Sequence, residues 1–180
     1  MPVHVAMLRG INVGARNRIK MPALESRFVD LGHTGVVSYI QSGNVVFVSR
    51  SKSTSKLARA IEQRLADDLG LDVAVLIRSR TELAQVVRAN PFLRAGADAS
   101  KLHVTFLAET PAADLVRALE TFESGPDEIA VLGREAYLFC PNGYGNTKLN
   151  PALIERRLKT ITTTRNWNTV TKLLELASSA

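Results

Sequence analysis

The sequence predicts an α+β protein of two ferredoxin-like halves that form one unit, with a helix at the C-terminus. The expected elements of residues 1–80 follow the order β-α-β-β-α-β, which is the split βαβ unit. The same order recurs over residues 101–180. Both halves open with a strand that has a histidine, a valine and a final leucine at matching places, VHVAML at 3–8 and KLHVTFL at 101–107. Residues 81–100 are the expected connecting helix and linker.

Each element of the first half has a local signal. Pro22 suits the first turn of a helix that Gly32 ends, and Gly70 ends a second helix with an apolar stripe. The tight turn at 42–44 joins two apolar runs into a hairpin. The predicted elements are strands at 3–8, 36–41, 45–48 and 72–77, and helices at 21–31 and 56–69.

The second half repeats these signals. Asn90-Pro91 stops the connecting helix at 81–89, and Pro111 and Asn150-Pro151 open two more helices. Gly133 is the expected turn of a second hairpin. The predicted elements are strands at 101–107, 127–132, 135–140 and 160–164, and helices at 111–122, 151–158 and 168–177.

Composition excludes some classes of protein. No apolar run approaches the ~20 residues of a membrane-spanning helix, so we expect no membrane partner. Cys140 is the only cysteine, which rules out an internal disulfide and favours the cytoplasm. It lies in an apolar stretch, which favours a buried structural thiol over a nucleophile. No spacing of histidine, cysteine and carboxylate side chains indicates a metal site, and no cofactor motif is present.

Positive charge is concentrated in the first third of the chain. Residues 1–60 hold nine cations and two carboxylates, whereas residues 61–180 hold fourteen cations and fifteen carboxylates. Such a local positive field attracts phosphorylated metabolites, nucleotides or nucleic acids. The alternative is that the charge serves solubility alone.

A glycine-rich basic loop at 9–20 is the main candidate site. Thirteen residues separate Leu8 from Pro22, but only three separate Leu107 from Pro111 at the equivalent place in the second half. The loop is therefore an insertion of about ten residues, and extra loops on a rigid scaffold commonly carry function. Its expected ligand-binding residues are Arg9, Gly10, Asn12, Gly14 and Lys20.

The predicted topology places other polar segments next to this loop. Because strands one and two are parallel in a split βαβ unit, the loop and the hairpin residues Gln41, Ser42 and Asn44 are expected at one edge of the sheet. The same geometry in the second half puts residues 141–148, including Lys148, beside residues 164–169. There the candidate residues are Arg165, Asn166, Trp167 and Asn168.

Three blocks of the sequence resemble a known bacterial family. They are LRGINVG at 8–14, YIQSGNVVF at 39–47 and TRNWNTV at 164–170. They are similar to the signature blocks of the domain of unknown function 1697, over essentially the whole chain. The resemblance implies an α+β fold with ferredoxin-like parts. It implies no activity and no catalytic residues.

Each candidate also has a structural interpretation. The loop is either an anion cradle or a long turn that uses glycine for backbone freedom. Trp167 is either a core anchor or a stacking platform, and Asn166 or Asn168 suits a helix cap. His4 and His103 are expected to be core histidines with satisfied hydrogen bonds. The strands of the first sheet are apolar on both faces, which disfavours base stacking on the sheet.

Three functional hypotheses follow. The first is a binding site or enzyme for a small anionic ligand that bears a phosphate or a nucleotide, with no catalytic residue assigned. The second is a nucleic-acid-binding module that uses the same basic edge. The third is an interaction domain without chemistry. The sequence leaves the oligomeric state open.

Overall fold

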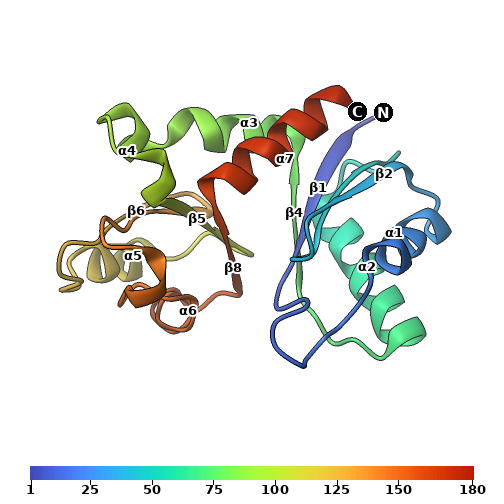
Figure 1. The fold of residues 1–180 in the computed structure, drawn as a ribbon, viewed down its shortest axis with the longest axis horizontal. Helices are drawn as coiled ribbons and strands as arrows, with labels where there is room; N and C mark the ends of the chain where they lie inside the picture. Colours follow the sequence, from blue (N-terminus) through green and yellow to red (C-terminus); the bar gives the residue numbers. More distant parts are fainter. The chain divides into compact units, whose positions relative to one another are not determined.

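The computed structural model describes residues 1–180. The chain divides into two compact units. The first comprises residues 1–85 and 172–180, and the second comprises residues 86–171 (Figure 1). No helix combines the length and the apolar character that crossing a membrane requires.

The first unit contains an antiparallel sheet of four strands in the order β2-β3-β1-β4. This order confirms the prediction that the third strand lies between the first and the second. The N-terminal elements are β1 (Val3–Leu8), α1 (Met21–Asp30), β2 (Thr34–Tyr39), β3 (Asn44–Val48), α2 (Thr54–Leu69) and β4 (Val75–Ser79).

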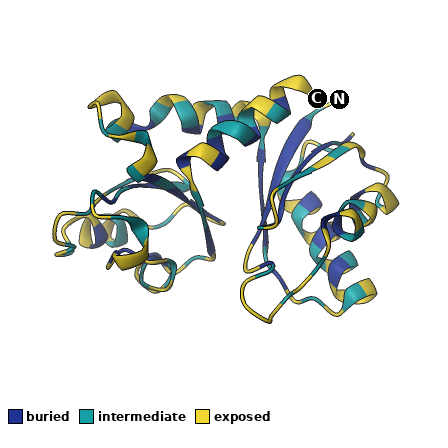
Figure 2. Cartoon of the chain, in the orientation of Figure 1, coloured by how far each residue is buried: buried dark blue, intermediate teal, exposed yellow.

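The core of the first unit lies between the sheet and helices α1 and α2. Leu24 and Phe28 of α1 and Ile61 and Leu65 of α2 are fully buried in one apolar cluster with side chains of β1, β3 and β4. All six residues of β1 are buried, as Figure 2 shows by their colour. Both faces of this strand are therefore shielded from solvent, and no face of it is open to bases.

The second unit repeats the same sheet order, β6-β7-β5-β8. A separate apolar cluster fills the space between this sheet and helices α5 and α6. The remaining elements are α3 (Arg80–Ala89), α4 (Pro91–Arg94), η1 (Ala99–Lys101), β5 (Leu102–Leu107), α5 (Ala113–Glu120), β6 (Glu128–Leu132), β7 (Glu135–Phe139), η2 (Tyr144–Asn146), α6 (Pro151–Leu158), β8 (Thr162–Asn166) and α7 (Trp167–Ser179). From Lys172 onward, α7 belongs to the first unit.

Several predicted boundaries were wrong, each for a local reason. β2 ends at Tyr39 and not at residue 41, because Ile40 adopts a left-handed backbone conformation with φ 51°. The strand predicted at 160–164 is shifted to 162–166, since Lys159 is left-handed and ends α6. Pro91 opens a short helix, α4, that the sequence did not indicate, and the Asn90 side chain caps it.

The internal repeat extends to the register of the strands. Val5 pairs with Arg78 in the first sheet, and Val104 pairs with Arg165 in the second. Arg78 is only 1% exposed. Each half thus places an arginine at the same position of its fourth strand, fully buried at Arg78 and partly buried at Arg165. The comparison of the first strands alone did not reveal this correspondence.

Candidate functional site

The basic loop at 9–20 forms a short, ordered finger. The amide of Asn12 donates to the carbonyl of Asn17 at 3.1 Å, and the amide of Arg16 donates to the carbonyl of Val13 at 3.3 Å. Val13 and Arg16 pair as an antiparallel bridge, with Gly14 in the turn between them at φ 60°. The Arg18 side chain donates from Nε to the carbonyl of Gly14 at 3.1 Å. The insertion is therefore a small hairpin of its own.

Asn12 joins this finger to the rest of the edge. Its Oδ1 accepts from the Ile19 amide at 2.8 Å, and its Nδ2 donates to the Ile19 carbonyl at 3.0 Å. The same Nδ2 donates to the Gln41 carbonyl at 2.8 Å. These bonds use the hydrogen-bonding capacity of the amide side chain. Asn12, predicted as a ligand contact, has a structural role here.

The hairpin between β2 and β3 packs directly beneath the finger. The Leu8 amide donates to the Gly43 carbonyl at 2.8 Å, and Ile11 is buried in the core at 2% exposure. A Cβ on Gly43 would lie 3.0 Å from the Leu8 Cβ and 3.1 Å from the Ile11 Cβ. Only glycine fits this position. The predicted meeting of the loop and the hairpin is confirmed.

Asn44 and Ser42 also support the hairpin. Asn44 is fully buried, and its Nδ2 donates to the Tyr39 carbonyl at 3.2 Å and to the Ser42 hydroxyl at 2.9 Å. Gln41 differs, because it is exposed. Of the three hairpin candidates, Gln41 is the residue that presents its side chain to solvent.

The cations of the finger face solvent. Arg9, Arg16, Arg18 and Lys20 are all exposed, and the exposed character of the loop is visible in Figure 2. Arg27 and Arg64 of this unit form ion pairs with Asp30 and Asp68, whereas neither Arg16 nor Lys20 is in an ion pair. Positive charge is therefore uncompensated at the tip and at the base of the finger.

The N-terminus of α1 adds to this positive field. Lys20 occupies the cap position, and no side chain caps the helix. There is also no acidic residue in the first turn. The other helices of eight residues or more have a side-chain cap or a first-turn carboxylate, for example Ser53 for α2 and Asn150 for α6. The first amides of α1 and its dipole are uncompensated.

The candidate residues of the second unit are mostly structural. Arg165 donates from Nη1 to the Thr163 hydroxyl at 2.7 Å and to the Thr164 carbonyl at 3.0 Å. Burial lowers the pKa of its guanidinium to about 10. Asn166 caps α7, since its Oδ1 accepts from the Thr169 amide at 2.8 Å. Trp167 is only 4% exposed.

These positions agree with the cap and the core-anchor interpretations of Asn166 and Trp167. Asn168 and Lys148 are exposed. Near Lys148, Tyr144 stacks on His103 with ring centroids 4.2 Å apart. His103 pairs with Asn166 of β8, so residues 141–148 lie close to the 164–169 segment as predicted.

His4 and His33 are buried and His103 is partly buried, and the hydrogen bonds of all three rings are incomplete. His4 is 1% exposed, and its Nε2 lies 3.0 Å from the Ser51 carbonyl, whereas its Nδ1 has no partner. His103 likewise has an unpartnered Nδ1. The prediction of fully satisfied core histidines was wrong in this respect. Burial lowers the pKa of both rings and that of His33.

Cys140 is the buried structural thiol that the sequence predicted. It is fully buried in the core of the second unit. Burial raises the pKa of the thiol, which keeps it protonated and unreactive at neutral pH.

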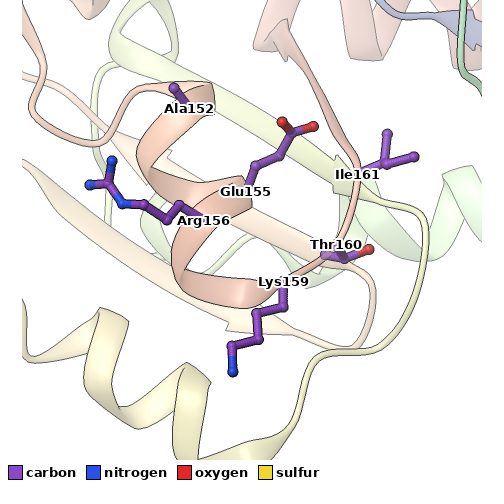
Figure 3. A pocket seen from close by; sticks show the side chains of 6 residues that line it. All are labelled: Ala152, Glu155, Arg156, Lys159, Thr160 and Ile161. Carbon is purple, nitrogen blue, oxygen red and sulfur yellow. The ribbon is translucent and has the colours of Figure 1, made fainter.

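A shallow hollow of about 480 Å³ lies on the second unit at the end of α6. Figure 3 shows Arg156 and Lys159 at its rim together with Glu155 and Ile161. It is less suited to an anion than the basic loop, for two reasons. The Glu155 carboxylate lies in its wall, and the C-terminus of a helix carries partial negative charge. A second hollow, of about 390 Å³, lies against α1 and β2 and includes the carboxylates Glu25 and Asp30.

Sequence reasoning missed Ile40 as a notable residue of the edge. It is 50% exposed and left-handed, a conformation that is unusual for a β-branched residue. No propensity of the YIQSGN segment indicated this, because glycine or asparagine is the residue type expected there.

Comparison with known proteins gives the family. Residues 1–137 match the family described as "Protein of unknown function (DUF1697)". The chain belongs to this family. No curated protein matches it. Among solved structures, it is similar to the conserved bacterial protein SP0830 from Streptococcus pneumoniae, with a TM-score of 0.78 and 24% identity over 98% of both chains. This likeness supports the fold and carries no function.

Proposed function

We propose that this protein binds a small phosphate-bearing anion at the edge formed by the basic loop and the 40–44 hairpin. One observation carries the proposal. Arg16 and Lys20 are exposed and in no ion pair, on a loop with four cations and no carboxylate. Uncompensated cations at one edge attract anions, and the uncapped N-terminus of α1 acts in the same direction.

The order of the loop strengthens the proposal. A flexible basic loop loses conformational entropy when it binds, whereas a preorganised one loses little. The bonds between the finger and its own backbone, and the Asn12 bond to Gln41, hold this loop in place before any ligand arrives. Arg9, Arg16 and Lys20 would supply charge, and Gln41 would supply hydrogen bonds. We assign the site to the first unit alone, because the partly buried Arg165 guanidinium donates to Thr163 and Thr164 within β8.

A nucleic acid is the second candidate ligand. It is favoured by the exposure of all four cations on a finger, since a phosphate backbone needs an accessible row of charge and no closed pocket. The buried faces of β1 and β3 still argue against base stacking on the sheet. We also infer a cytoplasmic protein, which the single buried cysteine supports, and a bacterial source, which the likeness to the Streptococcus pneumoniae protein supports.

Thermal unfolding in the presence of nucleotides, sugar phosphates and inorganic pyrophosphate tests the proposal. A ligand at 100 times its dissociation constant adds about 2.7 kcal/mol to the free energy of unfolding. We expect a shift for the wild type and none for Arg16→Glu/Lys20→Glu. A carboxylate at position 20 suits the N-terminus of α1, so this variant is expected to fold.

The matched control is Arg156→Glu/Lys159→Glu, which reverses the same number of charges at the hollow of the second unit. It should retain the ligand-induced shift. An equal shift in all three proteins, or no shift across the panel, would refute the proposal. Nucleic-acid binding is separated from small-ligand binding by its steep salt dependence, because the logarithm of its binding constant falls linearly with the logarithm of salt concentration.

A further inference from the structure

Exposed aliphatic side chains alternate with the cations of the proposed site. Val13 in the finger is 67% exposed and Ile40 in the hairpin is 50% exposed. Val13 pairs with Arg16 across the finger, and directly paired residues of an antiparallel bridge project to the same face. The same edge therefore presents an apolar surface next to uncompensated positive charge.

Ile40 is held in a conformation that opposes its own preference. Its φ of 51° is left-handed, which is strained for a β-branched side chain. The residues on both sides fix it there, since the Tyr39 carbonyl accepts from Asn44 and the Gln41 carbonyl accepts from Asn12. Asparagine or glycine would fit this backbone with less strain.

The strained conformation of Ile40 does not improve the packing of the core. Ile40 lies outside the apolar cluster of the first unit and leaves half of its surface in water. Strained residues cluster at ligand-binding sites, and the exposed side chain of Ile40 is accessible to a ligand.

We propose that Ile40 and Val13 contact the nucleobase of a ligand whose phosphates bind Arg16 and Lys20. This inference rests on the proposed function and narrows its ligand to a base joined to phosphate. Aliphatic side chains can pack on the face of a base, and the exposed Gln41 next to Ile40 offers an amide to the edge of the base. An acyl chain would make no use of that amide, which argues against a lipid.

Two sources provide this chemistry, a free nucleotide and a single-stranded nucleic acid. Both join a base to phosphate, and titrations with each distinguish them. Binding of adenosine triphosphate at least as tight as binding of a short oligothymidylate assigns the site to nucleotides. Markedly tighter binding of the oligothymidylate, which weakens with salt, assigns it to a single strand.

The test is the variant Ile40→Asn, measured for stability and for binding. Relief of the strained backbone is expected to raise the melting temperature by about 2–4 °C for a chain of this size. Affinity for adenosine triphosphate or oligothymidylate is expected to fall by roughly tenfold, because the apolar contact with the base is lost; tenfold corresponds to about 1.4 kcal/mol. Affinity for inorganic pyrophosphate should not change. A residue with a purely structural role would lower the melting temperature instead.

Ile161→Asn is the matched control, because Ile161 is 49% exposed and lies beside cations in the second unit. This variant should not raise the melting temperature, and it should leave the affinity for every probe unchanged. Val13→Asn is the second binding variant, since Val13 has no positive φ. It should weaken nucleotide binding without raising the melting temperature.

Each contrary outcome is informative. A lower melting temperature of Ile40→Asn, or unchanged nucleotide affinity in both Ile40→Asn and Val13→Asn, overturns the inference. If pyrophosphate still binds in that case, the proposed binding of a phosphate-bearing anion is retained and only the contact with a nucleobase is rejected. Loss of binding to phosphatidylserine vesicles in Ile40→Asn, with indifference to nucleotides, would assign the edge to a lipid surface and overturn the inference. If no phosphate-bearing probe binds the wild type, the proposed function fails as well.

Discussion

Replacing Asn12 is expected to detach the basic finger from the hairpin. The side chain makes three hydrogen bonds, two with Ile19 and one with the Gln41 carbonyl. An intramolecular hydrogen bond contributes roughly 0.5–1.5 kcal/mol net, and the bond to Gln41 is exposed. Asn12→Gly should therefore lower the free energy of unfolding of the first unit by about 2–3 kcal/mol. Glycine tolerates the φ of 54° at this position, so the loss reports the side chain.

Urea unfolding followed by far-ultraviolet circular dichroism measures this loss. With a dependence of about 1–3 kcal/mol per molar urea, the midpoint should fall by about 1 M. Fluorescence of Trp167 is the wrong signal for this purpose, because that residue belongs to the second unit. Amide hydrogen exchange adds a local reading. The Ile19 amide donates to Asn12 Oδ1, so its protection should be lost in the variant.

Two further variants separate the contributions. Asn12→Asp keeps the acceptor for the Ile19 amide and loses both donated hydrogen bonds. Its free energy of unfolding should therefore lie between those of the wild type and Asn12→Gly, and the Ile19 amide should stay protected. Asn12→Ala adds a left-handed cost of about 1–2 kcal/mol to the loss seen with glycine. If Asn12→Gly unfolds at the urea concentration of the wild type and keeps Ile19 protected, the described role of Asn12 is wrong.

Three other predictions concern the core around the site. Burial lowers the pKa of His4 and His33 below their ordinary 6.5, so the unfolded chain binds their protons first. The free energy of unfolding should be constant above about pH 7 and should fall as the pH drops below 6.5 toward the lowered pKa values of the folded state. A His4→Gln/His33→Gln double variant should show a flatter profile in urea unfolding from about pH 8 to about pH 5. Gly43→Ala should lower the free energy of unfolding of the first unit by roughly 2–3 kcal/mol. Gly14→Ala, whose Cβ would meet nothing within 4 Å, should lower it by only about 1 kcal/mol, because alanine is strained in the left-handed conformation. Equal losses in denaturant unfolding would contradict the close packing described at Gly43. Cys140 should react with a thiol reagent only as the protein unfolds, and rapid labelling of the native protein would contradict its burial.

The topology was predictable because it depends on patterns that the sequence displays. Apolar strands, proline-led helices and glycine ends recur in both halves, and the split βαβ rules then fix which strand lies in the middle. The same rules correctly placed the hairpin Gln41–Asn44 beneath the loop, more than twenty residues away in sequence. Element order and strand adjacency are thus encoded redundantly along the chain.

The roles of individual side chains were less predictable. Asn12 and Asn44 have the composition of a binding site, yet their amides satisfy the backbone of the loop and the hairpin. Asparagine suits both purposes, because it tolerates left-handed geometry and hydrogen-bonds locally. Only coordinates show whether its donors are already used.

Ile40 and Arg78 were missed for opposite reasons. Isoleucine rarely adopts a left-handed conformation, so the local sequence does not predict the positive φ of Ile40. Arg78 would have been recognisable had the fourth strands of the two halves been aligned, since it occupies the position of Arg165. A repeat that is weak in residue identity still carries positional information.

Titration of adenosine triphosphate followed by calorimetry tests the central claim most directly. The measurement compares the wild type, Arg16→Glu/Lys20→Glu and Arg156→Glu/Lys159→Glu. The account predicts that reversal of the loop charges abolishes binding, while the second-unit variant binds as the wild type does. Wild-type affinity in the loop variant, or loss of binding in the second-unit variant alone, would contradict the assignment of the site to the basic loop.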